Sequence, residues 1–126
     1  MELSSATIIR SSDKNGMRTT YSEYIFHLSS CRVNGSIGLF EGRFRETTMN
    51  YNLHYHKQMT EIFTVAKGEF YFILDDKEYT LHEDDTVIVA PMVVHGFKPK
   101  LPGSRLQFIF TKQMTGKVFL QAWQKL

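Results

Sequence analysis

Short runs of β-branched and aromatic residues, broken every few positions by turns rich in glycine and aspartate, restrict the fold of this chain more than any other feature. Such spacing is typical of an antiparallel sandwich or barrel. We therefore expect an all-β fold. The predicted strands cover residues 6–10, 21–28, 36–44, 61–66, 69–74, 78–81, 86–89, 93–97 and 106–111.

Only the last residues of the sequence show a helical pattern. Val118, Ala122 and Leu126 recur at intervals of four, with Phe119 and Trp123 in the adjacent stripe. This pattern predicts a short helix over about residues 115–126 that packs one face on the barrel. Residues 11–17 and 98–104 are loops by composition. With 126 residues and no linker or repeat, we expect one domain spanning residues 1–126.

Charge and composition argue against several classes of function. Lysine and arginine are interspersed with aspartate and glutamate, giving a net charge of +2 without a basic run, so we expect neither nucleic acid nor a membrane as partner. The first residues lack the features of a signal peptide, and no stretch approaches the roughly 20 apolar residues of a membrane helix. Cys31 is the only cysteine, which rules out an internal disulfide and favours a cytoplasmic location. Any metal must therefore use histidine and carboxylate ligands.

The segment Leu53–Glu61 carries residues with metal-ligand chemistry. On a strand, side chains two positions apart point the same way, so His54 and His56 can project from one face. Glu61 follows after a short gap, and His95 on a later strand can supply a fourth ligand if the sheet closes. Two histidines and a carboxylate on one face form the arrangement used by non-haem iron sites. The competing interpretation is polar alternation on a solvated strand, with Glu61 as a surface charge.

These residues resemble the motifs of the cupin superfamily. The first motif of that family contains a His-x-His pair, a glutamate and, six residues later, a glycine, and is matched here by His54, His56, Glu61 and Gly68. The second motif centres on a proline-rich turn before one histidine, and Val89–His95 resembles it. The resemblance covers about residues 40–110. It implies a cupin-type double-stranded β-helix, or jelly-roll, barrel with its core at about residues 36–111.

The resemblance also implies that one divalent transition metal is bound by His54, His56, Glu61 and His95. These ligand types suit iron, manganese, nickel, zinc or copper. The sequence departs from the family pattern at Asp84 and Met92, where glycine is usual. The alternative is a degenerate cupin whose pocket is empty or holds only an organic ligand.

The expected function is that of a metal-binding cupin that acts on or binds a small molecule. If one coordination position stays open, the metal could bind dioxygen or polarise a substrate oxygen. The candidate activities are therefore those of a metal-dependent dioxygenase or isomerase. The alternative is a non-catalytic module that sequesters or senses a metal or small ligand. A third reading is a structural or interaction protein without a metal.

The remaining residues predict an apolar pocket and its surroundings. Aromatic residues on the central strands alternate inward, and most belong to the core: Phe63, Phe70, Phe72, Phe97, Phe108 and Phe110. Arg43, Arg45 and Tyr51 could orient an anionic substrate, although a solvated face is the alternative for the arginines. His27 and His82 lack motif spacing and are interpreted as structural or surface residues.

A homodimer is expected, because small open-ended barrels expose strand edges that need covering. Residues 6–10 and the helix that bears Trp123 are the candidate contacts.

Overall fold

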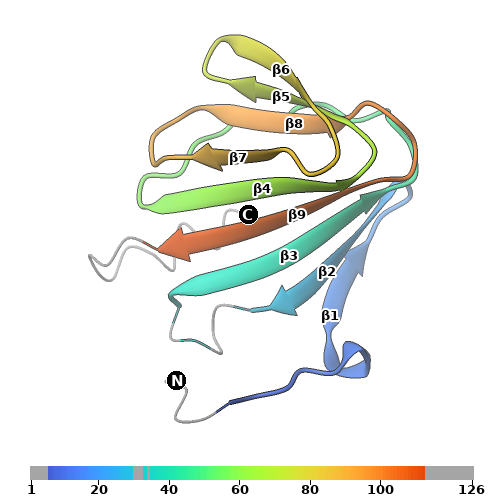
Figure 1. Cartoon of the computed structure of the whole chain (residues 1–126), viewed down its shortest axis with the longest axis vertical. Helices are drawn as coiled ribbons and strands as arrows, with labels where there is room; N and C mark the ends of the chain where they lie inside the picture. The colour runs from blue at the N-terminus through green and yellow to red at the C-terminus, as the bar shows by residue number, and fades with distance from the viewer. Residues whose placement is uncertain (1–5, 30–32, 34, 113–126) are drawn as a thin grey trace.

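The chain forms two antiparallel sheets that face each other, as seen in a computed structural model that describes residues 6–29, 33 and 35–112 (Figure 1). A short 3-10 helix, η1 (Ser11–Asp13), precedes the strands, which are β1 (Asn15–Arg18), β2 (Ser22–Leu28), β3 (Ile37–Phe44), β4 (Met59–Lys67), β5 (Phe70–Leu74), β6 (Lys77–Leu81), β7 (Thr86–Val89), β8 (His95–Pro99) and β9 (Ser104–Lys112). The predicted all-β fold is confirmed. The predicted helix at 115–126 and Cys31 lie outside the described residues.

The larger sheet has the strand order β1-β2-β3-β9-β4-β7, and the smaller one has the order β6-β5-β8. In β4, alternate residues from Met59 to Val65 are buried, and β9 shows the same alternation from Ser104 to Phe110. Because side chains on a strand point alternately to opposite faces, these central strands each present one apolar face to the interior. The buried hydrophobic residues form one cluster: Phe44, Met59, Phe63, Val65, Phe70, Phe72, Val89, Leu106, Phe108 and Phe110.

The outer face of the larger sheet carries a row of aliphatic side chains. Leu39 on β3 pairs with Ile109 on β9, and Ile62 on β4 pairs with both Ile109 and Ile88 on β7. Ile88 at the end of this row is 67% exposed. We call Leu39, Ile109, Ile62 and Ile88 the aliphatic row. It lies on the face opposite the buried aromatic cluster.

Two predictions for the N-terminal part of the chain are wrong. Residues 6–10 form no strand, and Ile8 is 74% exposed, because β-branched residues favour a strand only where they pack on a neighbour. Residues 11–17 are not simply a loop, since they include η1 and most of β1. Gly16 permits this pairing: a Cβ there would come within 2.5 Å of the Tyr24 carbonyl oxygen on β2.

Among the described residues, none of the helical structure has the length and apolar character required to cross a bilayer.

Candidate metal centre

Three parts of the fold bring the candidate ligands together. Glu61 lies on β4, His95 begins β8, and His54 and His56 lie on the connection between β3 and β4. The two histidines of this connection are not on a regular strand as expected. Instead, His54 forms an isolated bridge with His95, in which each backbone N–H donates to the other carbonyl at 3.0 and 2.9 Å.

A tight turn before His95 holds the second histidine of the connection. The Val93 N–H donates to the Ala90 carbonyl at 3.4 Å, and Met92 has a φ of 74°. Pro91 at the second position and a positive φ at the third are typical of a type II turn. The Met92 N–H also donates to the His56 carbonyl at 2.7 Å. The turn therefore links the two segments that supply the histidines.

The four side chains place one ligand atom each within 4.8 Å of one another. This span is only slightly more than the about 4.4 Å that separates atoms on opposite sides of one ion with 2.2 Å bonds. Glu61 Oε1 lies 2.7 Å from both His56 Nε2 and His95 Nε2. His54 completes the group, with its ring centroid 4.5 Å from that of His95 and 4.9 Å from that of His56.

Backbone carbonyls orient two of the imidazoles. The Nδ1–H of His54 donates to the Asn52 carbonyl at 2.7 Å, and the Nδ1–H of His95 donates to the Val93 carbonyl at 2.8 Å. A carbonyl oxygen can only accept, so Nδ1 carries a proton in both rings. Metal-binding histidines usually have such a partner on their other nitrogen. His95 Nε2 also forms a hydrogen bond with Glu61 Oε1 at 2.7 Å, and a metal would replace the proton of that bond.

His56 Nε2 provides an independent test of whether a metal fits. This nitrogen is buried and has no hydrogen-bond partner, although Glu61 Oε1 is only 2.7 Å away. The two atoms are within hydrogen-bond distance but do not form a hydrogen bond. A buried polar atom without a partner is costly. A cation placed among these atoms would satisfy it, so the donor set fits a metal ion.

The residues of the cluster shift one another's pKa values. Burial alone would raise the pKa of Glu61, but His56 and His95 outweigh burial and lower it below the ordinary value. Burial lowers the pKa of His95, but the hydrogen bond to Glu61, the charge of Glu61 and the hydrogen bond to Val93 together raise it above the ordinary value. Burial and the neighbouring histidines lower the pKa of His54, against the hydrogen bond to Asn52. Glu61 is therefore ionised and His54 favours the neutral form that binds a metal, whereas a metal would compete with a proton for His95 Nε2.

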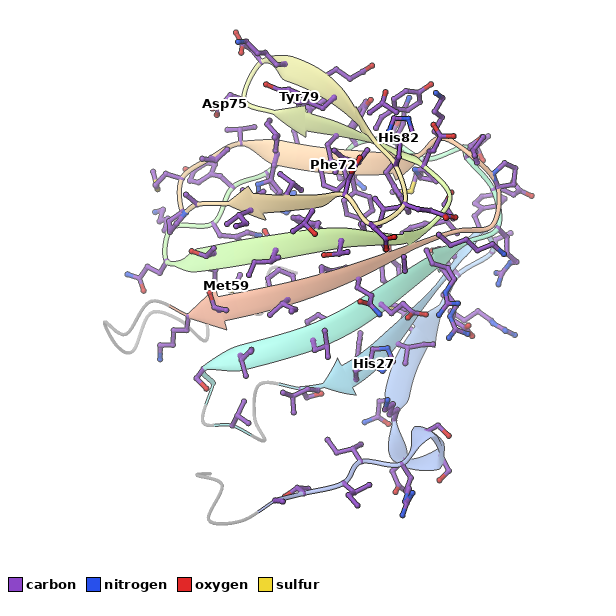
Figure 2. All side chains as sticks on the ribbon, in the orientation of Figure 1. His27, Met59, Phe72, Asp75, Tyr79 and His82 are labelled. Carbon is purple, nitrogen blue, oxygen red and sulfur yellow. The ribbon has the colours of Figure 1, made fainter. Side chains whose placement is uncertain are left out.

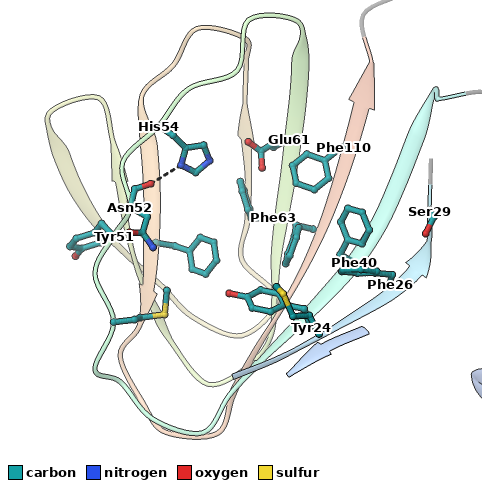
Figure 3. Close-up of a pocket in the computed structure, with 14 residues that line it drawn as sticks. Tyr24, Phe26, Ser29, Phe40, Tyr51, Asn52, His54, Glu61, Phe63 and Phe110 are labelled. Atoms are coloured by element: carbon teal, nitrogen blue, oxygen red, sulfur yellow. Dashed lines mark hydrogen bonds between the residues drawn. The ribbon is translucent and has the colours of Figure 1, made fainter. Parts of the chain in front are cut away.

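The cluster lies at one end of a cavity of about 700 Å³ between the two sheets (Figure 3). His56, Glu61 and His95 are 6%, 2% and 1% exposed, whereas His54 is exposed. The described lining residues are Met17, Tyr24, Phe26, Ser29, Phe40, Met49, Tyr51, Asn52, His54, Glu61, Phe63, Phe97, Phe108 and Phe110. A metal held by the cluster would thus meet the cavity on the side of His54 and Glu61.

Other residues considered from the sequence lie elsewhere. His27, labelled on β2 in Figure 2, lies with its Nδ1 2.8 Å from Lys14 Nζ. His82 is exposed, and its Nε2 lies 3.4 Å from Glu69 Oε1 (Figure 2). Neither histidine joins the cluster. Both act as structural or surface residues, which agrees with their lack of motif spacing.

The two arginines that could have oriented an anionic substrate do not line the cavity. Arg43 donates to Glu41 at 2.6 Å on the outer face of β3. Arg45 donates to the carbonyls of Thr19 and Thr20 at 2.8 and 3.0 Å. Tyr51 does line the cavity, and its hydroxyl donates to Glu78 at 2.8 Å.

Sequence reasoning missed several residues of the site. The alternation in the predicted strand at 21–28 contained a signal for Tyr24 and Phe26, which lie on the inward face of β2. Met17 and Met49 line the cavity from segments without any inward pattern.

Two facing antiparallel sheets with three histidines and a glutamate at one end of an internal cavity define a class of small β-barrel with a candidate metal centre. Residues 46–106 match the model of the Cupin domain family. No curated protein sequence matches the chain.

Solved structures of similar fold are numerous. An RmlC-like cupin from Shewanella frigidimarina is 17% identical, with a TM-score of 0.69 over 87% of this chain and 94% of that one. The iron(II) form of HppE is 15% identical, with a TM-score of 0.74 over 87% and 62%. Bacillus subtilis oxalate decarboxylase, studied for its Mn(II) centres, is 12% identical, with a TM-score of 0.71 over 91% and 32%. The chain therefore contains a match to the Cupin domain family over residues 46–106 and shares the fold of these structures.

Proposed function

We propose that this cupin binds one divalent transition metal through His54, His56, Glu61 and His95 and uses it on a small molecule held in the cavity. The observation that carries the proposal is the buried His56 Nε2, which has no hydrogen-bond partner inside a cluster that could hold an ion. The similarity to structures described with iron(II) and Mn(II) supports iron or manganese as the metal. Such an ion would supply Lewis-acid or redox chemistry on its open side.

The residues around the cluster favour oxygen chemistry over isomerisation. Isomerisation of a carbonyl compound needs a general base. Apart from His54 and Glu61, the ionisable groups among the described lining residues are Tyr24 and Tyr51. Burial raises the pKa of Tyr24, and burial together with Glu78 raises the pKa of Tyr51 to about 12. Neither tyrosine can accept a proton at neutral pH, so a dioxygenase is the activity we propose.

The lack of a free base among the described lining residues also supports a second candidate, a cupin that holds a metal or small ligand without turnover. The two functions differ in oxygen consumption: iron-loaded protein given aromatic diketones and flavonoids takes up oxygen only if it is an oxygenase. Stoichiometric binding with no uptake of oxygen would favour the module.

Metal binding itself is tested by calorimetric titration of metal-free protein with Mn²⁺ and, without oxygen, with Fe²⁺. We expect one ion per chain. His56→Ala should weaken binding by at least about tenfold, whereas His82→Ala, which removes an exposed histidine outside the cluster, should leave affinity unchanged. Absence of binding by the unmodified protein, or equal loss in both variants, would overturn the proposed site.

A further inference from the structure

The walls of the cavity have an unusually uniform chemistry. Of the fourteen described lining residues, ten are phenylalanine, tyrosine or methionine. Some of their rings meet edge to face, as at 75° between Tyr24 and Phe108 and 71° between Phe26 and Phe40, and others are tilted, as at 37° between Phe63 and Phe108. Rings arranged in this way offer both faces and edges to a further aromatic ring, which prefers such contacts.

The described walls of the cavity contain no lysine or arginine. Arg43 and Arg45 are held outside by Glu41 and by backbone carbonyls. Lys98 lies with its Nζ 4.9 Å from the centre of the Tyr51 ring but does not line the cavity. A negatively charged group placed away from the metal would be desolvated without a partner, which is costly.

The distribution of polar groups gives the cavity two unlike ends. His54 and Glu61 lie at one end, and Tyr24 and Phe26 lie at the other (Figure 3). Glu61 offsets one of the two charges of a divalent ion, so about one positive charge remains for a ligand atom. The cavity volume of about 700 Å³ lies in the range of sites for whole organic molecules rather than two-carbon acids.

We infer that the cavity takes a neutral molecule with an aromatic or apolar body and a single oxygen-bearing end that meets the metal, and that it discriminates against small dianions. This inference names the ligand class of the proposed metal centre and rests on that function. The apolar body would be held by the aromatic walls, and the oxygen-bearing end by the ion.

Three probes test the inference on the Mn²⁺-loaded protein. Benzohydroxamic acid and acetohydroxamic acid are both neutral in solution at neutral pH and bind a metal through the same hydroxamate group after loss of one proton. They differ by an aromatic ring, whereas oxalate is a small dianion. Each dissociation constant, measured by calorimetry, is divided by that for free Mn²⁺ in the same buffer. On this scale we expect benzohydroxamic acid to bind at least about tenfold more tightly than acetohydroxamic acid, and oxalate to bind worst. Equal affinities for the two hydroxamic acids, or a preference for oxalate, would overturn the inference.

A matched pair of variants locates the preference. Phe26 lines the cavity, whereas Ile25 is its neighbour on the opposite face of β2. We expect Phe26→Ala to lower the preference for the aromatic probe by about fivefold and Ile25→Ala to leave it unchanged, with the Mn²⁺ affinity of both variants intact. Equal effects in the two variants would contradict binding at these walls.

A metal-free measurement separates this inference from the proposed function. Fluorescence of the neutral dye Nile red in metal-free protein reports the apolar cavity alone. Enhanced fluorescence that Phe26→Ala reduces, in a protein that binds no metal, would refute the metal centre but retain an apolar ligand. Metal binding without dye binding or a hydroxamic acid preference would refute the ligand class and leave the metal centre standing.

Discussion

Glu61 is almost completely buried and has His95 Nε2 and His56 Nε2 within 2.7 Å. Removing His95 would leave this carboxylate short of a partner in a low-dielectric interior. We therefore expect His95→Ala to reduce the free energy of unfolding of the metal-free protein by about 3 kcal/mol or more. His54 is exposed, so His54→Ala should cost about 1 kcal/mol or less. Urea denaturation of metal-free protein measures both, and equal losses would contradict this account of the buried pair.

A second buried carboxylate makes stability depend on pH. Burial would raise the pKa of Glu41, but the hydrogen bonds and charges of Arg43 and Arg105 outweigh it and lower the pKa below its ordinary value of 4.5. The unfolded chain therefore binds a proton more readily, and the stabilisation is complete above pH 4.5 and is lost as the pH falls through the folded-state pKa.

Glu41→Gln tests this contribution. In this variant the melting temperature should fall less steeply as the pH drops below 4.5. Glu46→Gln, at an exposed carboxylate, should leave the fall in melting temperature unchanged. An unchanged fall of the melting temperature at acid pH in the Glu41 variant would show that its arginine partners do not stabilise the ionised carboxylate.

Spacing identified His54, His56 and Glu61, because a His-x-His pair with a nearby glutamate is recognisable in the sequence, whereas His95 was identified by the resemblance to the second cupin motif. The sequence could not identify the carbonyls of Asn52 and Val93 as partners of the histidine rings, because every residue has a backbone carbonyl. The outward position of Arg43 depends on the pairing of Glu41 with Gln107, which only the assembled sheet fixes.

The turn from Ala90 to Val93 contains a residue in an unfavourable conformation. Met92 has a φ of 74°, where side chains other than glycine are strained, and its own side chain is 59% exposed. We expect Met92→Gly to raise the free energy of unfolding by about 0.5–1 kcal/mol, because the relief of strain exceeds the added chain entropy. Ala90→Gly, without a positive φ to relieve, should lower it slightly. Thermal melts of the two variants give the comparison, and a lower melting temperature for Met92→Gly would contradict it.

Elements with a buried face were predictable, and those without one were not. The alternating runs that became β4 and β9 owe their pattern to the core that they cover. β1 was missed because all four of its residues are exposed, and such an edge strand has no alternation to detect. The connection bearing His54 and His56 was mistaken for a strand, because a polar pair two positions apart also occurs on an irregular segment held by a single bridge.

Association of two copies stays a prediction, and the aliphatic row is the surface best suited to it. Leu39, Ile109, Ile62 and Ile88 lie side by side across four neighbouring strands, which places apolar area on a broad sheet face. Ile88→Glu would place a charge on this face and should convert a dimer to monomers in size-exclusion chromatography with light scattering. Tyr79→Glu, at an exposed position on β6 of the smaller sheet, is the control. If the unmodified protein is a monomer, the prediction of a dimer is wrong.

The bridge between His54 and His95 has one more consequence. The two residues are about forty positions apart in the chain, and two backbone hydrogen bonds join their segments. An ion on both side chains would act as a reversible cross-link that closes this loop, so the melting temperature would rise with the logarithm of free metal concentration above the dissociation constant. The melting temperature of a freshly purified sample would then indicate what fraction of the protein carries a metal ion.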